Sequence, residues 1–294
     1  MTLAKIAILI LQVSVFIIVF ALGLKESWQS ATSLFRRPGM LIRSLLSVNV
    51  LMPVFAAAIA AVFHFSPAVK IALIFLAISP LPPILPQKQL RLGGRADYVY
   101  GLITALSVFS IVFVPLAVEV LGKVFGRDVH VGIFFVAKAV FRTILLPTGL
   151  GMLVHHWAPE FAARVSVLLG RIGNGLLVVG ILPLFVVAWR PAVSLIRQGD
   201  IVAMIAFTAF GVAAGHWLGG PDPAERRSLA LATASHHPGL AIAIAAANFP
   251  AQRLLVAAAV VLYLLISAFV LLAYNAWCKR RMVTESLRSE RRAA

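Results

Sequence analysis

Two adjacent histidines and a serine interrupt a long apolar stretch, where the chain reads ASHHPG. Imidazole changes charge between about pH 5 and 8, and its neutral ring both donates and accepts hydrogen bonds. Pro238 disfavours helical backbone at His237, and Gly239 tolerates backbone angles that other residues avoid. We therefore expect Ser235, His236 and His237 to line a substrate site. Two alternatives stay open: the histidines carry a coupling proton, or they only satisfy backbone groups that the proline frees.

A second interruption is predicted where four prolines fall within seven residues, at Pro80, Pro82, Pro83 and Pro86. Each proline removes a helical N–H bond and clashes with the preceding turn, so a helix cannot run through the cluster. The first proline lies about 20 Å into its apolar segment at 1.5 Å per residue, near the middle of a membrane. The polar residues that begin at Gln87 predict a second short helix. The alternative is a kink or an early helix end.

Two cations, Lys138 and Arg142, lie four residues apart and so share one face of a helix. Arg142 falls near the middle of its apolar segment, where a cation costs at least about 2.5–3.5 kcal/mol and normally faces a cavity or a partner. We expect Arg142, together with Lys138, to meet the negative charge of a substrate. The alternatives are a lysine that reaches the membrane surface and an arginine that caps backbone carbonyls.

The composition identifies the class of protein that holds these residues. Of 294 residues, 61% are hydrophobic and 12% are charged, and the mean hydropathy is +0.99. Soluble domains are about 45–50% apolar and about 25% charged, so a cytosolic enzyme, a secreted disulfide module and a disordered protein are excluded. The single cysteine, Cys278, excludes an intramolecular disulfide. The sequence predicts an all-α polytopic membrane protein.

Nine apolar segments are long enough to cross a bilayer core of about 30 Å as helices. They cover residues 3–24, 40–63, 67–93, 97–121, 131–155, 165–189, 200–219, 226–248 and 251–277. We expect one transmembrane domain at 1–278 and a basic cytoplasmic tail at 279–294. The first segment is interpreted as a retained span; the alternative, a cleaved signal peptide, has a shorter apolar run and a small-residue cleavage site.

Basic residues predict the orientation of the spans, because they accumulate on the cytoplasmic side. With the N-terminus outside, fifteen Lys and Arg residues face the cytoplasm and six face outward. We therefore expect a protein of the plasma membrane (the bacterial inner membrane) with its C-terminus in the cytoplasm. The net charge of +16 is explained by this topology and by contact of the tail with anionic membrane lipids, not by nucleic-acid binding.

The two interruptions occupy corresponding places in two halves of the chain. The first repeat covers about 3–121 and the second about 165–277, with a linking span at 131–155 between them. The interrupted helix is third in each half, and the odd linking span gives the halves opposite orientation. This pattern is typical of inverted-repeat secondary transporters, whose substrate site lies where the discontinuous helices meet. Chance placement of two breaks is the alternative.

Short motifs along nearly the whole chain support a family resemblance. They are ALGL at 21–24, NVLMP at 49–53, Ser79-Pro80, GLAIA at 239–243 and Asn248-Phe249. On these residues the sequence resembles the bile acid:sodium symporter family. The resemblance implies a panel of spans one, five and six that moves against a core of the other spans, with two broken helices crossing in the core. It also implies transport of bile acids, steroid conjugates or small organic acids, usually with sodium.

The chain departs from the family pattern where sodium ligands are expected. Residues Val99, Ile103 and Ala232 stand where the resemblance implies oxygen-bearing side chains, although Asn49 keeps an amide in span two. Sodium is a hard cation that prefers oxygen ligands, and all ten acids lie in loops, tails or span ends. The resemblance implies sodium, whereas the residue content favours a proton or no coupling ion. No bound cofactor and no protein metal site are expected.

The leading hypothesis is a secondary active transporter of a small organic anion that works by alternating access. Its substrate site is predicted to comprise Asn49, Gln87, Lys138, Arg142, Ser235, His236 and His237. The alternative is a transporter-like sensor or partner subunit that binds ligand without net transport. An enzyme is not expected, because no nucleophile–base pair or metal motif is found at depth. The substrate, the direction of transport and the oligomeric state are left open by the sequence.

Overall fold

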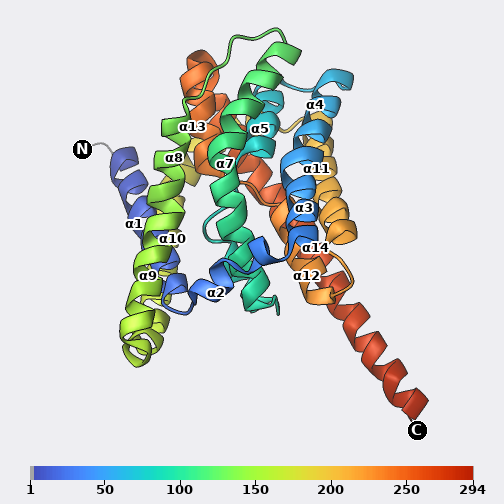
Figure 1. The fold of residues 1–294 in the computed structure, drawn as a ribbon. Coiled ribbons are helices and arrows are strands. Elements are labelled where there is room, and N and C mark those ends of the chain that lie inside the picture. The colour runs from blue at the N-terminus through green and yellow to red at the C-terminus, as the bar shows by residue number, and fades with distance from the viewer. Residues whose placement is uncertain (1–2, 294) are drawn as a thin grey trace.

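The computed structural model describes the backbone of residues 3–293 and the side chains of residues 6–281 other than residue 184. Within this part of the chain every regular element is a helix, as predicted for an all-α membrane protein (Figure 1). The elements are α1 (Leu3–Gly23), α2 (Trp28–Ala31), η1 (Ser33–Arg36), α3 (Pro38–Leu45), η2 (Leu46–Leu51), α4 (Met52–Val62), α5 (Pro67–Ile78), α6 (Leu85–Arg91), α7 (Ala96–Val124), α8 (Ile133–Val140), η3 (Phe141–Leu145), α9 (Leu146–Trp157), α10 (Pro159–Ser194), α11 (Gln198–Leu218), α12 (Pro223–Thr233), α13 (Pro238–Asn248), η4 (Pro250–Gln252) and α14 (Arg253–Ala293).

Eight helical stretches of the described chain are long and apolar enough to cross a membrane. The shorter apolar helix α5 and the helix α6 together occupy the third predicted segment. Helix α14 is longer than its predicted segment, because its 41 residues extend about 60 Å. It therefore continues beyond a bilayer core of about 30 Å and through most of the predicted basic tail.

The helices α1, α9 and α10 pack together on one side of the molecule (Figure 1). Glycines allow the close approach of α1 and α9, since a Cβ atom on Gly151 would lie 2.5 Å from the carbonyl oxygen of Phe20. On α10, the backbone oxygen of Gly173 accepts a hydrogen bond of 2.8 Å from Ser14. We call α1, α8, η3, α9 and α10 the panel. They correspond to the first, fifth and sixth predicted segments.

The remaining spanning helices form a second group, which we call the core: α3 to α7 and α11 to α14. Its centre is α5, which packs against α4, α13 and α14 and whose Val69, Ala72, Leu73 and Leu76 have no exposed surface. Helices α11 and α12 approach closely at Gly215, where a Cβ atom would lie 2.6 Å from the Cα atom of Ala230. Small residues at such contacts are typical of helix packing in membranes.

Two of the spans contain a short π-helix, η2 and η3. Each is followed by a proline in the first turn of the next helix, Pro53 and Pro147. A proline has no N–H group to donate and clashes with the carbonyl four residues earlier, so the helix widens before it. The candidate residues Asn49 and Arg142 both lie on these widened turns.

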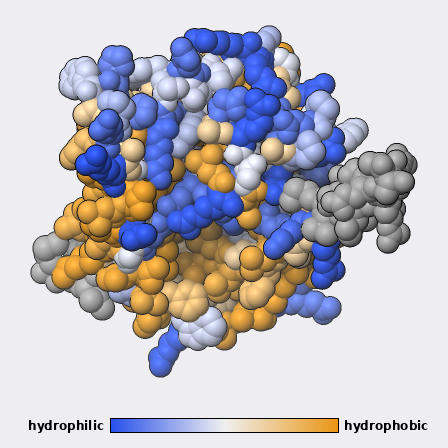
Figure 2. All heavy atoms as spheres, turned by 90° about the horizontal axis from the view of Figure 1, so that it is seen from below, coloured by the Kyte–Doolittle hydropathy of each residue, from blue (hydrophilic) through white to orange (hydrophobic). Residues whose placement is uncertain are grey.

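Charged residues join several elements at one end of the molecule. Arg37 contacts both carboxylate oxygens of Glu225 at 2.5 and 3.0 Å, and Arg95 contacts Asp97 at 2.9 Å and Asp222 at 3.3 Å. Figure 2 shows this end, where hydrophilic residues cover a broad area and apolar residues gather beside it. It is the end predicted to face the cytoplasm, and α14 leaves from it (Figure 1). The orientation in the membrane stays a prediction.

Candidate substrate site at the crossing of two interrupted helices

The first interruption separates α5, which ends at Ile78, from α6, which begins at Leu85. The hydroxyl of Ser79 donates to the carbonyl of Phe75 at 2.6 Å and so caps the end of α5. Residues 79–84 contain Pro80, Pro82 and Pro83 and are not helical. Pro86 was predicted to be part of the break, but it lies in the first turn of α6, where a missing N–H group costs no hydrogen bond.

The second interruption separates α12, which ends at Thr233, from α13. Pro238 is the first residue of α13 and therefore starts the second half-helix, and Pro86 likewise lies in the first turn of α6. The phenol of Tyr263 donates a hydrogen bond of 3.0 Å to the carbonyl of Ala234, which the break leaves without a helical partner. Both predicted interruptions are thus present in the fold.

The two interruptions meet in space. The backbone N–H group of His237 donates a hydrogen bond of 2.9 Å to the carbonyl oxygen of Pro80. The two residues are far apart in the sequence, and each lies between its two half-helices. This bond fixes the crossing point of the two broken helices.

The two adjacent histidines, which the sequence does not distinguish, have different roles at the crossing. The Nδ1 atom of His237 accepts a hydrogen bond of 3.1 Å from the N–H group of Leu240, so this ring caps the start of α13. The ring of His236 is 2% exposed, and neither of its nitrogens has a hydrogen-bond partner among the described residues. An unpaired buried polar group costs about 1–3 kcal/mol. His236 is therefore the histidine that is free to bind a ligand.

The surroundings of His236 are aromatic on one side. Its ring lies 5.2 Å from the ring of Phe207 and 6.5 Å from the ring of Tyr263, measured between centroids. The π-helix η2 packs against α5, α11 and α12, and the Oδ1 atom of its Asn49 is also buried without a described partner. Ser47, on the same turn, is joined to Thr233 by a hydroxyl–hydroxyl bond of 2.7 Å. Unpaired donors and acceptors thus lie on elements that pack at the crossing.

Three further predicted residues lie close to the interruptions. Ser235 is partly buried, and its N–H group donates to the carbonyl of Ala232 at 3.1 Å. Gly239 is exposed in the first turn of α13. Gln87 lies on α6 and faces the panel, since its Nε2 atom is 4.0 Å from the position of a Cβ atom on Gly170 of α10. The crossing and the panel-facing side of α6 thus hold different candidates.

Lys138 and Arg142 are not brought to the crossing. Both side chains are exposed, whereas Val136, Val140 and Ile144 on the same span are buried. Each cation lies two residues from a buried residue, and a separation of two residues corresponds to about 200° around a helix. The cations therefore lie on the face opposite the buried one. The expectation that Arg142 is buried in a cavity is wrong. The spacing correctly places both cations on one face, but that face points away from the core.

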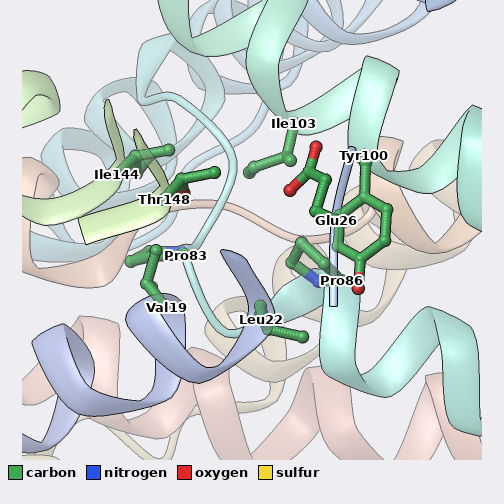
Figure 3. Close-up of a pocket in the computed structure, with 9 residues that line it drawn as sticks. All are labelled: Val19, Leu22, Glu26, Pro83, Pro86, Tyr100, Ile103, Ile144 and Thr148. Carbon is green, nitrogen blue, oxygen red and sulfur yellow. The ribbon is translucent and has the colours of Figure 1, made fainter. Parts of the chain in front are cut away.

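Three acids are buried that the sequence places in loops or at span ends. Glu225 is paired with Arg37, and the Oδ1 atom of Asp200 accepts a bond of 2.8 Å from the N–H group of Ser66. The third, Glu26, lies three residues after the end of α1 and points into a small cavity (Figure 3). The only signal for its burial in the sequence is its position directly after a span.

The oxygen atoms described at the crossing do not form a cluster of carboxylates that could bind a cation. No group of three or more His, Cys, Asp or Glu side chains that could hold a metal ion occurs among the residues whose placement is described. The oxygens near the interruptions are hydroxyls, backbone carbonyls and the amide of Asn49. These are weaker ligands for a hard cation than a carboxylate.

A helical membrane protein whose two interrupted helices cross at their breaks has the architecture of a secondary transporter. The family model described as "Sodium Bile acid symporter family" matches residues 12–195, which is more than half of the chain. The protein belongs to this family of transporters. The matched region contains the panel from residue 12 onward and the first interruption, and it ends before the second. No curated protein matches the chain.

Proposed function

We propose that this protein is a secondary active transporter of a small organic anion, with its substrate site at the crossing of the two interrupted helices. The observation that carries the proposal is the hydrogen bond from the N–H group of His237 to the carbonyl of Pro80. It joins the two breaks at one point, where irregular backbone offers polar groups inside an apolar protein. Family membership supports transport of a carboxylate or a bile-acid-like molecule.

The start of α13 supplies the attraction for an anion. Helix N-termini carry a partial positive charge and free N–H groups. Gly239 is exposed in this first turn, so its backbone is accessible to a ligand. The unpaired ring of His236 and the hydroxyl of Ser235 precede it directly. In this proposal they bind the anion, while His237 holds the half-helix in place.

The panel moves against the core in this mechanism, and this movement exposes the site to alternate sides of the membrane. Sodium is the coupling ion that the family description names. The described oxygens near the interruptions belong to hydroxyls, backbone carbonyls and the amide of Asn49, and this favours a proton or uncoupled transport instead. Comparing sodium with potassium therefore forms part of the test.

The first experiment is thermal unfolding of the purified protein with taurocholate, benzoate, pyruvate and succinate as probes, in sodium or potassium and at pH 6 or pH 8. A ligand that binds the folded state raises the unfolding midpoint by mass action. We expect at least one anion to stabilise the wild type and the control His64→Ala, whose ring is exposed. The same anion should stabilise His236→Ala much less. Equal stabilisation of all three proteins would remove His236 from the site.

The exposed cations are tested by the variant Arg142→Ala. If the anion binds at the crossing, this variant keeps the ligand-induced shift of the wild type, because Arg142 lies on the opposite face of its span. Loss of the shift in a folded Arg142→Ala protein would move the anion site from the core to the panel.

A further inference from the structure

Glu26 is a buried carboxylic acid at the contact between the panel and the core. The residue is 2% exposed, and its Oε1 atom has no hydrogen-bond partner among the described residues. Figure 3 shows its side chain extending from the segment that follows α1 toward Ile103 and Tyr100 of α7. A carboxyl group has to be strongly favoured by its surroundings to stay ionised away from water. Nothing described around Glu26 provides such stabilisation.

The cavity at Glu26 is built by both groups of helices. The panel contributes Leu22 and Thr148, and the core contributes Pro86, Tyr100 and Ile103. Its volume of about 10 Å³ is the room that a single water molecule requires. An apolar cluster of α1 and α7 residues, with α6 and α10 packed against it, closes the neighbouring contact. Relative movement of the panel and the core would therefore open this cavity to solvent.

The charged and titratable groups near Glu26 do not offset its burial. On α7 the nearest is Tyr100, which lines the cavity. On α9, the Nδ1 atom of His155 lies 2.9 Å from the carbonyl of Leu24 and is occupied by it. Lys25 in the chain and Lys88 on α6 are exposed. Burial alone therefore acts on Glu26, and it raises the pKa of the carboxyl to about 8.

We propose that Glu26 is a proton-binding site whose occupancy is linked to the contact between the panel and the core. The carboxylate takes up one proton from water when the two groups close around it, and the acid releases that proton when they separate. The inference rests on the proposed alternating access, because it needs a state in which the cavity is open. In the proposed transport cycle, Glu26 therefore binds a proton in the closed state and releases it in the open state.

The strength of the coupling between proton binding and closure follows from the pKa of the Glu26 carboxyl in the open and in the closed state. In an open state Glu26 has its ordinary pKa of 4.5, and in the closed state the pKa is about 8. The protonated group favours the closed state fully below pH 4.5, and this preference is lost as the pH rises through 8. Between these values the ratio of closed to open molecules falls about tenfold per pH unit.

The test compares unfolding midpoints between pH 5 and pH 9 for the wild type, Glu26→Gln and Glu160→Gln. Glu160 is a matched control because its side chain is 89% exposed. We expect the midpoints of the wild type and of Glu160→Gln to fall by the same amount up to about pH 8. The neutral amide should remove this fall. A wild-type fall that Glu26→Gln retains would overturn the assignment, and Glu26→Met is the second neutral variant should the amide fail to fold.

Hydrogen–deuterium exchange tests the link to the panel–core contact. After correction for intrinsic rates, peptides that contain α6 or the end of α1 should lose protection between pH 5 and pH 8 in the wild type. They should keep it in Glu26→Gln. Equal protection at both pH values in the wild type would contradict the linkage. Neither measurement uses a transported anion, so a failure of the proposed transport activity would leave both results interpretable.

Discussion

A single methyl group at Gly215 tests whether the close contact of α11 with α12 holds the second interrupted helix in place. In an open helical position, glycine to alanine stabilises a helix by about 0.8–1.0 kcal/mol. At Gly215 the added Cβ atom would lie 2.5 Å from the carbonyl oxygen of Leu229 and 2.6 Å from the Cα atom of Ala230. Both are backbone atoms, which no side-chain rotation can move.

The two helices must separate to accommodate the methyl group in Gly215→Ala. Overpacking of this kind costs about 1–3 kcal/mol, which exceeds the gain in helix propensity over most of its range. Gly175 on α10 is the matched control, because a Cβ atom there would meet nothing within 4 Å. The same substitution should therefore lower the unfolding midpoint at Gly215 and raise or preserve it at Gly175.

The assay is thermal unfolding in detergent, read by tryptophan fluorescence, with size-exclusion chromatography to confirm a folded sample. The separation of α11 from α12 should also weaken any ligand-induced shift, because α12 leads directly into the crossing. If Gly215→Ala is as stable as Gly175→Ala, the contact is looser than described. The contact of α11 with α12 would then not be what positions the second half-helix.

Two further substitutions test hydrogen bonds that support the site. Tyr263→Phe removes the donor to the carbonyl of Ala234 and should lower the free energy of unfolding by about 0.5–1.5 kcal/mol, measured by detergent or urea titration. No change would show that another group satisfies this carbonyl. Asp200→Ala removes the acceptor of the Ser66 N–H group at the start of α5 and should cost about 1–3 kcal/mol in the same titration. A cost as small as that of an exposed substitution would contradict the burial of this acid.

The spans and their interruptions were predictable because they depend on local chemistry. Apolar length defines a span, and the prolines from Pro80 to Pro83 prevent a continuous helix wherever the chain lies. The role of Pro86 and Pro238 was harder to predict. A proline breaks a helix or begins one according to which turn it occupies, and only the fold determines that turn.

The candidate site could be predicted only in part, because direction and burial depend on distant elements. Helical spacing places Lys138 and Arg142 on one face but cannot say which way the face points. His236 and His237 are equivalent in the sequence, and only the fold separates their roles, because the ring of His237 accepts a bond from the N–H group of Leu240 and the ring of His236 has no described partner. Glu26 follows a span like any loop residue, and α6 and α7, far along the chain, bury it.

The proposed function requires that an anion bound at the crossing is carried across the membrane. Its most direct test is uptake of the labelled anion that raises the unfolding midpoint, by liposomes that contain the wild type, His64→Ala or His236→Ala. We expect uptake above that of empty liposomes for the first two proteins and a large loss of uptake for His236→Ala. Binding without uptake by the wild type would contradict it and identify a ligand-binding protein that does not transport.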